Sequence, residues 1–150
     1  MSKRKASILR AEKMKVVYVA GPYTAATEEL KQVNIRMASI TARELWANGC
    51  SVICPHLNTR DFELAPETSS LSHNVWIEGD LAIIARCDAV VLLPGWEGSH
   101  GARQEVLYAL QKGKPVYHSQ RMEELWQMDI SASRRARYRL DTLCADEEKE

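Results

Sequence analysis

An apolar run that ends in a turn of small residues is the feature that most constrains how this chain folds. Residues 89–93 read Ala-Val-Val-Leu-Leu, and the run stops at Pro94-Gly95. A glycine-containing loop then leads into a helical pattern at residues 105–110. A continuous apolar run bounded by turn residues is typical of a strand buried on both faces. The segment therefore predicts a buried strand, a turn, and a helix whose first N–H groups point at the turn.

Strand and helix patterns alternate along most of the chain. Strands are expected at residues 15–20, 51–54, 89–93 and 115–118. Helices are expected between them, at residues 27–48, 74–87 and 102–112. Strands that alternate with helices form a parallel sheet with helices on both faces, which is the α/β class. Such sheets bind ligands beyond the carboxyl ends of their strands, so the site is expected there.

The first long helix carries a repeating apolar pattern. Within residues 27–48, apolar or small side chains recur at intervals of three and four, and this spacing predicts the face that packs on the sheet. The residues of this face are Leu30, Val33, Met37, Thr41 and Leu45. Gly49 follows the pattern and marks the expected end of the helix.

The remaining segments set the expected domain organisation. Residues 1–14 are interpreted as a flexible extension, residues 15–118 as a single domain, and residues 119–150 as a helical tail that docks or makes an oligomer contact. Residues 55–72 predict a long loop, because they contain Asn, Asp, Pro and a Ser/Thr cluster. A loop of this length inside a compact domain is often a functional lid.

Charge and hydropathy exclude several classes of partner. The chain has 20 basic and 20 acidic residues, so no overall field favours nucleic acid or a membrane surface. No apolar run is long enough to span a bilayer, and Lys13 and Lys15 interrupt any signal-peptide pattern near the start. These features predict a cytoplasmic protein with no membrane contact, for which nucleic acid is an unlikely partner.

The metal-ligating residues do not form a recognisable metal motif. No pair of histidines has the H-x-x-x-H spacing, and the cysteines are too scattered for a zinc or disulfide framework. Buried thiols in a reducing compartment are the better interpretation. We therefore expect neither a metal nor another cofactor. The cysteines are Cys50, Cys54, Cys87 and Cys144, and the histidines are His56, His73, His100 and His118.

Three polar residues converge on the predicted ligand end of the sheet. Tyr18 lies near the exit of the first strand, Asp80 on the helix before the third strand, and Glu105 on the helix after it. Each has a structural interpretation as well: Tyr18 as a core aromatic, Asp80 as a solvated helix residue, and Glu105 as a partner of the helix dipole. Their common location beside a Gly/Ser loop favours a chemical role.

The same residues belong to a longer pattern that spans Val16 to about Tyr117. Its pieces are Tyr18-x-Ala-Gly-Pro, Trp76-x-x-x-Asp80-Leu, Cys87-Asp-Ala-Val-Val, and Gly98-Ser-x-Gly101-x-x-x-Glu105-x-x-x-Ala109. In this order and spacing they resemble the nucleoside 2-deoxyribosyltransferase superfamily, and also an uncharacterised branch from bacterial and phage genomes. The resemblance implies a three-layer, flavodoxin-like or Rossmann-like sandwich with four or five parallel strands. It also implies a homo-oligomer with sites at subunit boundaries.

The resemblance implies roles for individual residues. Glu105 matches the family's nucleophile, Asp80 the acid that orients or protonates the departing base, and Tyr18 the tyrosine that contacts the nucleophile. Substrate contacts are implied for two loops at the ligand end of the sheet. The residues of these loops are Gly21, Pro22, Tyr23, Trp96, Ser99, His100 and Gly101.

One position bears on the substrate. Relatives that act on free nucleosides carry an Asp six positions before the nucleophilic Glu, and here that position is Ser99. A Ser at this place resembles the nucleoside 5′-monophosphate N-glycosidase branch, in which it binds phosphate. That branch also has a basic residue in its first loop, whereas residues 21–24 have none. His100, Arg103 or a neighbouring subunit would have to supply the charge.

These observations predict an enzyme that cleaves the N-glycosidic bond of a nucleoside or nucleoside 5′-monophosphate and releases the base. Two alternatives from related chemistry are a base-exchanging 2-deoxyribosyltransferase and a non-catalytic nucleotide sensor. A third is an interaction protein organised by the tail, whose basic run includes Arg134, Arg135, Arg137 and Arg139. We expect at least a homodimer, with helix 27–48 or helix 74–87 at the contact and the ligand near that boundary.

Overall fold

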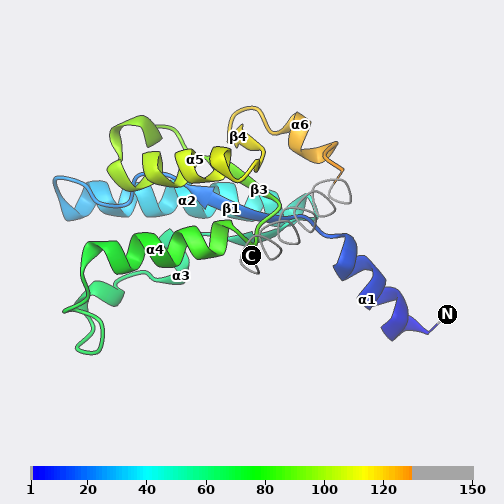
Figure 1. The fold of residues 1–150 in the computed structure, drawn as a ribbon, viewed down its shortest axis with the longest axis horizontal. Coiled ribbons are helices and arrows are strands. Elements are labelled where there is room, and N and C mark those ends of the chain that lie inside the picture. The colour runs from blue at the N-terminus through cyan, green and yellow to red at the C-terminus, as the bar shows by residue number, and fades with distance from the viewer. Residues whose placement is uncertain (1, 130–150) are drawn as a thin grey trace, which may run out of the picture.

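The structure, a computed structural model, describes residues 2–129 and contains a four-stranded parallel sheet (Figure 1). The strand order is β2-β1-β3-β4, and every neighbouring pair is parallel. The two central strands are the most apolar, as expected for strands buried on both faces. The strands are β1 (Val16–Ala20), β2 (Ser51–Ile53), β3 (Ala89–Leu92) and β4 (Val116–His118). The predicted α/β class and parallel topology are confirmed.

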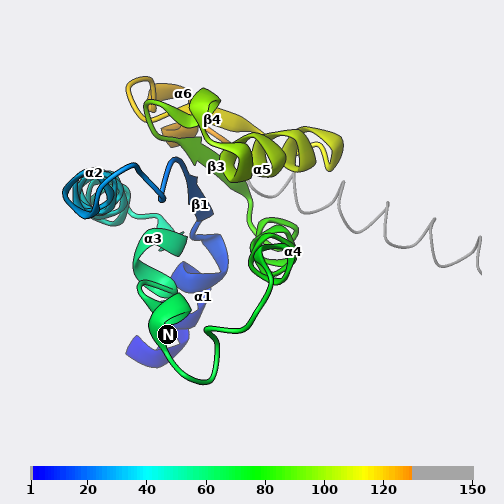
Figure 2. The ribbon, with the colours of Figure 1, turned by 90° about the vertical axis from the view of Figure 1, so that its left-hand side faces the viewer.

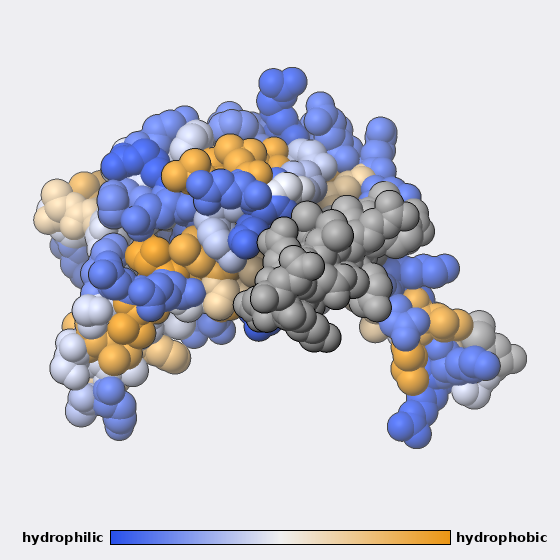
Figure 3. Space-filling view, in the orientation of Figure 1, coloured by the Kyte–Doolittle hydropathy of each residue, from blue (hydrophilic) through white to orange (hydrophobic). Residues whose placement is uncertain are grey.

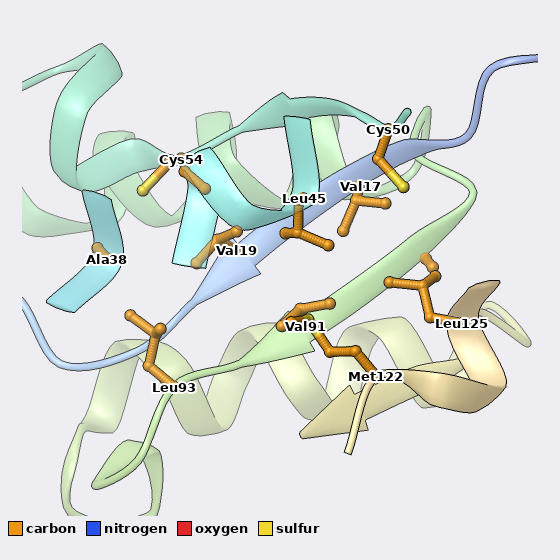
Figure 4. Close-up of a cluster of buried hydrophobic side chains, with 12 residues drawn as sticks. Val17, Val19, Ala38, Leu45, Cys50, Cys54, Val91, Leu93, Met122 and Leu125 are labelled. Atoms are coloured by element: carbon orange, nitrogen blue, oxygen red, sulfur yellow. The ribbon is translucent and has the colours of Figure 1, made fainter. Parts of the chain in front are cut away.

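Helices cover both faces of the sheet, which gives three layers (Figure 2). Side chains alternate along β1 and β3, so each strand contributes to two separate cores. Val17 and Val91 belong to the first core, which faces α2 (Glu28–Ala47) and α6 (Glu123–Trp126). Figure 4 shows the side chains of this first core. Tyr18 and Val90 belong to the second core, which faces α4 (His73–Ile84) and α5 (His100–Gln111). Tyr18 is therefore directed toward the two helices that carry the predicted acidic residues.

Helix α5 begins two residues earlier than its sequence pattern predicts. The Ser99 side chain accepts a hydrogen bond from the backbone N–H of Ala102 at 3.2 Å, so Ser99 is the N-cap. Glu105 consequently lies in the second turn of α5 and faces the sheet, where it is 7% exposed.

Two segments expected to be irregular contain helix. Residues 55–72 were expected to form one long loop, but they include α3 (Pro55–Asn58) and the 3₁₀ helix η1 (Phe62–Leu64). Pro at the first position of α3 and a chain of local turn hydrogen bonds organise this segment. The segment before residue 15, expected to be a flexible extension, contains helix α1 (Lys3–Lys13). Its Ser2 side chain caps the helix, although none of its residues is buried.

The start of the tail belongs to the core. Met122 and Leu125 are buried against the face of the sheet that α2 also covers. This part of the chain forms the short helix α6. The basic run at residues 134–139 and Cys144 lie outside the described residues.

The buried face of α2 differs from the predicted one. Thr41 and Leu45 of the predicted face are buried, but Leu30, Val33 and Met37 are exposed. Ala38 and Ala42 pack on the sheet in their place. The helix carries two apolar stripes, and the stripe with small residues is the one that packs. Alanine allows the helix backbone to approach the pleated sheet more closely than a large side chain does.

The central strands β1 and β3 come very close where they end. Gly21 follows β1, and a Cβ atom added to it would lie 2.6 Å from the Cβ of Leu93, which follows β3. The backbone N–H of Leu93 donates to the carbonyl of Ala20 at 2.8 Å and extends the pairing up to this point. The loops after the two strands therefore begin side by side.

This approach predicts the effect of adding one methyl group. Gly21→Ala should destabilise the protein by about 1–3 kcal/mol, because either the backbone or the Leu93 side chain must shift to make room for the added methyl group. Gly79→Ala is the matched control, since its added methyl meets nothing within 4 Å and a helical Gly→Ala change stabilises by roughly 0.5–1 kcal/mol. Urea unfolding followed by circular dichroism measures both. Equal stability of the two variants would contradict the close approach.

Candidate functional site

A pocket of about 480 Å³ opens at the carboxyl ends of β1, β2 and β3. This volume is in the range of small-molecule sites. Its walls come from the loops after these strands, from the 55–63 segment, and from the facing surfaces of α4 and α5. The predicted position of the site, beyond the carboxyl ends of the strands, matches that of the pocket.

The floor of the pocket holds a buried hydrogen bond between two predicted catalytic residues. The Tyr18 hydroxyl donates to Oε1 of Glu105 at 2.9 Å. Both side chains are buried, and Glu105 lines the pocket, whereas Tyr18 does not line it. Asp80 reaches the same pocket from α4. The fold thus brings together Tyr18, Asp80 and Glu105, which are far apart in the sequence.

Burial shifts the protonation of this cluster. Desolvation raises the pKa of Glu105 to about 8; the Tyr18 hydrogen bond lowers it, and the nearby Asp80 charge raises it further. Desolvation also raises the pKa of Asp80 to about 6, opposed by the Tyr18 hydroxyl. The Tyr18 pKa is raised well above 10 by burial and then by the two carboxylates, so its hydroxyl keeps its proton. The two carboxyl groups therefore form a coupled pair that loses its protons in two steps and holds one proton near neutral pH.

His56 is a pocket residue whose role the sequence did not indicate. Its ring nitrogen Nε2 donates to the carbonyl of Pro22 at 2.8 Å, and its ring meets the Tyr23 ring edge-on at 5.7 Å between centroids. Burial lowers the pKa of His56, which favours the neutral ring. The side chain ties the loop after β2 to the loop after β1. The sequence could have suggested His56 as a site residue, because it lies just after β2, whose carboxyl end is at the ligand edge of the sheet.

A second cluster holds the 59–64 segment at the pocket mouth. Lys31 of α2 contacts Asp61 and Glu63, each at 3.1 Å, and lies 5.0 Å from the centroid of the Tyr23 ring. The Tyr23 hydroxyl donates to Glu63 at 3.3 Å. Desolvation lowers the Lys31 pKa, but the hydrogen bonds to Glu63 and Asp61 outweigh it, so the pKa is raised and Lys31 stays charged. The expected lid is therefore pinned to α2 and to the loop after β1.

The predicted substrate-binding residues divide into two groups. All but one of them line the pocket, and the exception is Trp96. The Trp96 ring packs instead against the second core and lies 6.5 Å from the His118 ring. Its Nε1 is buried, and no partner for it is found among the described residues. The lining residues from the prediction are Gly21, Pro22, Tyr23, Ser99, His100 and Gly101.

The pocket is acidic. Glu63, Asp80 and Glu105 line it, and the described part of the chain contributes neither Lys nor Arg to its walls. Arg103, one of the expected sources of positive charge, donates to the carbonyl of Glu97 at 2.7 Å on the exposed side of α5. His100 does line the pocket. The charge around the pocket thus opposes a bound anion.

Metal and membrane features can be stated for residues 2–129. Within that range no group of three or more His, Cys, Asp or Glu side chains is arranged to hold a metal ion. Cys50, Cys54 and Cys87 are buried, as expected. No described helix combines the length and apolarity needed to cross a membrane.

Comparison with known proteins places the chain in a family. Residues 15–118 match the family described as a domain of unknown function, DUF4406. The chain belongs to this family. No functionally curated protein sequence matches it. The matched range coincides with the domain predicted from the alternation of strands and helices.

Two solved structures are similar to this DUF4406 protein. A 2-deoxyribosyltransferase from Bacillus psychrosaccharolyticus is 21% identical, with a TM-score of 0.47 over 69% of this chain and 70% of that one. A 2-desoxiribosyltransferase from Leishmania mexicana is 18% identical, with a TM-score of 0.46 over 69% of this chain and 63% of that one.

The buried carboxyl groups predict a dependence of stability on pH. The folded pKa of Glu105, about 8, exceeds its ordinary value of 4.5, so the folded protein binds more protons than the unfolded chain between these values. Stability must fall as pH rises through this window, by at most about 1.4 kcal/mol per pH unit for each group. Asp80 contributes in the same direction, but only up to about pH 6.

Glu105→Gln isolates the contribution of Glu105, because the amide still accepts the Tyr18 hydrogen bond and has no charge. Between pH 6 and 8 the wild type should lose stability, while the variant stays nearly constant. Urea unfolding at several pH values measures the two slopes. Parallel slopes would contradict the raised pKa of Glu105.

Proposed function

We propose that this protein cleaves the N-glycosidic bond of a nucleoside, with Glu105 as the nucleophile. The observation that carries the proposal is the buried Tyr18–Glu105 hydrogen bond on the floor of a pocket that Asp80 also lines. Enzymes that cleave glycosidic bonds usually use two carboxyl groups with different pKa values, one as the carboxylate and one as the proton donor. The motif resemblance to nucleoside 2-deoxyribosyltransferases supports the same assignment.

In the first step, the Glu105 carboxylate attacks C1′ of the sugar. The C1′–N bond breaks, and its electron pair leaves with the base. Protonated Asp80 donates its proton to the departing base, directly or through water, so the base leaves as a neutral molecule. The product is a glycosyl ester of Glu105. Tyr18 orients the carboxylate through its hydroxyl and does not exchange its own proton.

In the second step, water attacks C1′ and releases Glu105 as a carboxylate. The proton lost by the water goes to Asp80, which is thereby ready for the next cycle. If a second base attacks in place of water, the same ester yields a new nucleoside. Hydrolysis and base exchange therefore share the first step and the same residues.

The high pKa of Glu105 is compatible with this role. In the empty pocket burial favours the protonated form of Glu105 over that of Asp80. As C1′ acquires positive charge, its attraction stabilises the Glu105 carboxylate, and the single proton is transferred to the group near the base. Burying two carboxyl groups costs folding free energy, and a pocket that only sensed nucleotides would gain nothing from it. This cost favours an enzyme over a sensor.

The charge of the pocket bears on the substrate. A 5′-phosphate would enter a pocket lined by three carboxyl groups, and the nearby Lys31 is already paired with Asp61 and Glu63. We therefore propose the free nucleoside as the substrate, in place of the monophosphate that Ser99 suggests from the sequence.

The first prediction from this proposal concerns catalysis. Glu105→Gln should lower the rate of base release by at least about 10³-fold, because the amide cannot form the ester. Glu97→Gln, an exposed change outside the pocket, is the matched control and should keep wild-type activity. The rate of base release is measured by chromatography for a panel of nucleosides, once with and once without an added acceptor base. Normal turnover by folded Glu105→Gln would refute the role of Glu105.

A second prediction concerns the phosphate. In the Glu105→Gln background, which prevents turnover, calorimetry should show a nucleoside binding at least about threefold tighter than its 5′-monophosphate, a small electrostatic effect at the pocket mouth. Adding Glu63→Gln should reduce this difference in affinity between nucleoside and monophosphate, because it removes one carboxylate from the mouth of the pocket. Adding Glu97→Gln should leave it unchanged. Tighter binding of the monophosphate would contradict the free nucleoside as substrate and favour the nucleoside 5′-monophosphate.

A further inference from the structure

His56 is the one buried residue of the segment 55–72, which forms part of the pocket wall. It is 3% exposed, whereas Leu57, Phe62 and Leu64 of the same segment are 43%, 45% and 74% exposed. Figure 3 shows apolar residues on the surface at the lower left, where α3 and the loop after it lie. Apolar packing therefore contributes little to the position of this segment, and the polar contacts of His56 contribute more.

Both ring nitrogens of His56 are engaged by other groups of the protein. Nε2 lies 2.8 Å from the carbonyl oxygen of Pro22, which can only accept, so Nε2 carries the proton. In the neutral ring Nδ1 is then an acceptor, and the Sγ atom of Cys54 lies 3.9 Å from it. A thiol is a weak donor, so this contact orients the ring more than it stabilises it. Burial lowers the pKa of His56 and keeps the ring neutral.

The loop after β1 is held by side chains instead of by other backbone groups. In the described part of the chain, residues 22–24 make no backbone-to-backbone hydrogen bond. The carbonyl of Pro22 accepts from His56, and the next carbonyl, that of Tyr23, accepts from the Asn34 side chain of α2 at 3.2 Å. Residues 22–24 line the pocket. His56 and Asn34 thus fix two successive carbonyls of one pocket wall.

We propose that His56 is a positioning residue for the glycosidic cleavage, a role that rests on the proposed function. As the neutral Nε2–H tautomer, it holds the loop after β1 in the shape that receives the substrate, and it exchanges no proton with the substrate. A histidine in a pocket is commonly an acid or a base. Here neither nitrogen is available for that role, and in the proposed reaction Asp80 and Glu105 already supply the acid and the nucleophile.

The position of His56 predicts which kinetic constant depends on it. A wall that contacts the substrate and the transition state alike contributes to binding and not to the rate of the bound complex. The Tyr18–Glu105 hydrogen bond does not involve the loop after β1. Loss of the bond from His56 to Pro22 should therefore raise KM and leave kcat within about threefold of the wild type.

Two amide variants test the two ring nitrogens separately. The amide nitrogen of glutamine can reach the position of Nε2 and donate to Pro22, whereas the shorter asparagine can replace only Nδ1. His56→Gln should keep KM within about threefold of the wild type, and His56→Asn should raise it about tenfold, as expected for the loss of one buried hydrogen bond. His118→Asn, at an exposed histidine outside the pocket, is the matched control and should leave KM unchanged. Circular dichroism checks that all three variants are folded.

The pH profile separates positioning from acid–base chemistry. In His56→Asn, the profile of kcat/KM should keep the limbs of the wild type, since Asp80 and Glu105 set them in the proposed reaction. Loss of one limb, or a fall in kcat of about 100-fold or more in both His56 variants, would overturn the positioning role, because either result identifies an acid or base. Equal KM values for His56→Gln and His56→Asn would also overturn it.

A measurement that needs no turnover separates this role from the proposed cleavage. NMR of nitrogen-labelled protein should show a protonated Nε2 and an unprotonated Nδ1 on His56 near neutral pH. The amide signals of Tyr23 and Thr24 should shift in His56→Asn and stay close to the wild type in His56→Gln. An Nδ1–H tautomer, or loop signals that neither variant moves, would overturn the role of His56. A wild type that shows the expected signals but releases no base would refute only the cleavage.

Discussion

The close approach of β1 and β3 at their carboxyl ends is the constraint on which the site depends. Gly21 fits against Leu93 only because it has no side chain, and the hydrogen bond from Leu93 to Ala20 keeps the strands paired up to that point. The same register directs Tyr18 toward α4 and α5. If these strands diverged earlier, the Tyr18 hydroxyl would no longer reach Glu105, and the two loops that begin at this edge would no longer border one pocket.

The second organising property is the burial of carboxyl groups without a cationic partner among the residues that line the pocket. Burial raises the pKa of Glu105 and Asp80 and so opposes folding at high pH. The Tyr18 hydrogen bond offsets part of this cost for both groups. A structural role would be met at lower cost by an apolar side chain or an amide. The destabilising burial is thus the physical argument for chemistry, and it explains why the same two residues control both pH stability and the proposed reaction.

Support from behind the pocket comes from α2. Lys31 holds the 59–64 segment, and Asn34 holds the carbonyl of Tyr23, so one helix positions two walls of the site. The sequence could not show this, because Lys31 and Asp61 are far apart in the chain and each is an ordinary surface residue by type. Only the Thr41 and Leu45 part of the buried face of α2 was predicted correctly, for a related reason. The helix carries two apolar stripes of similar quality, and only the shape of the sheet selects the one that contains alanines.

The sequence by itself determined the α/β class, the order of strands and helices, and the candidates Tyr18, Asp80 and Glu105, because hydrophobic period and turn residues are local properties. It also located the pocket, since parallel strands end at a common edge. Tertiary structure alone decided that His56 belongs to the site and Trp96 does not, that the 55–72 segment is folded, and that the pocket is acidic. These features depend on which side chains meet across distant elements and on how much water the folded chain excludes, and neither quantity is encoded at any single position.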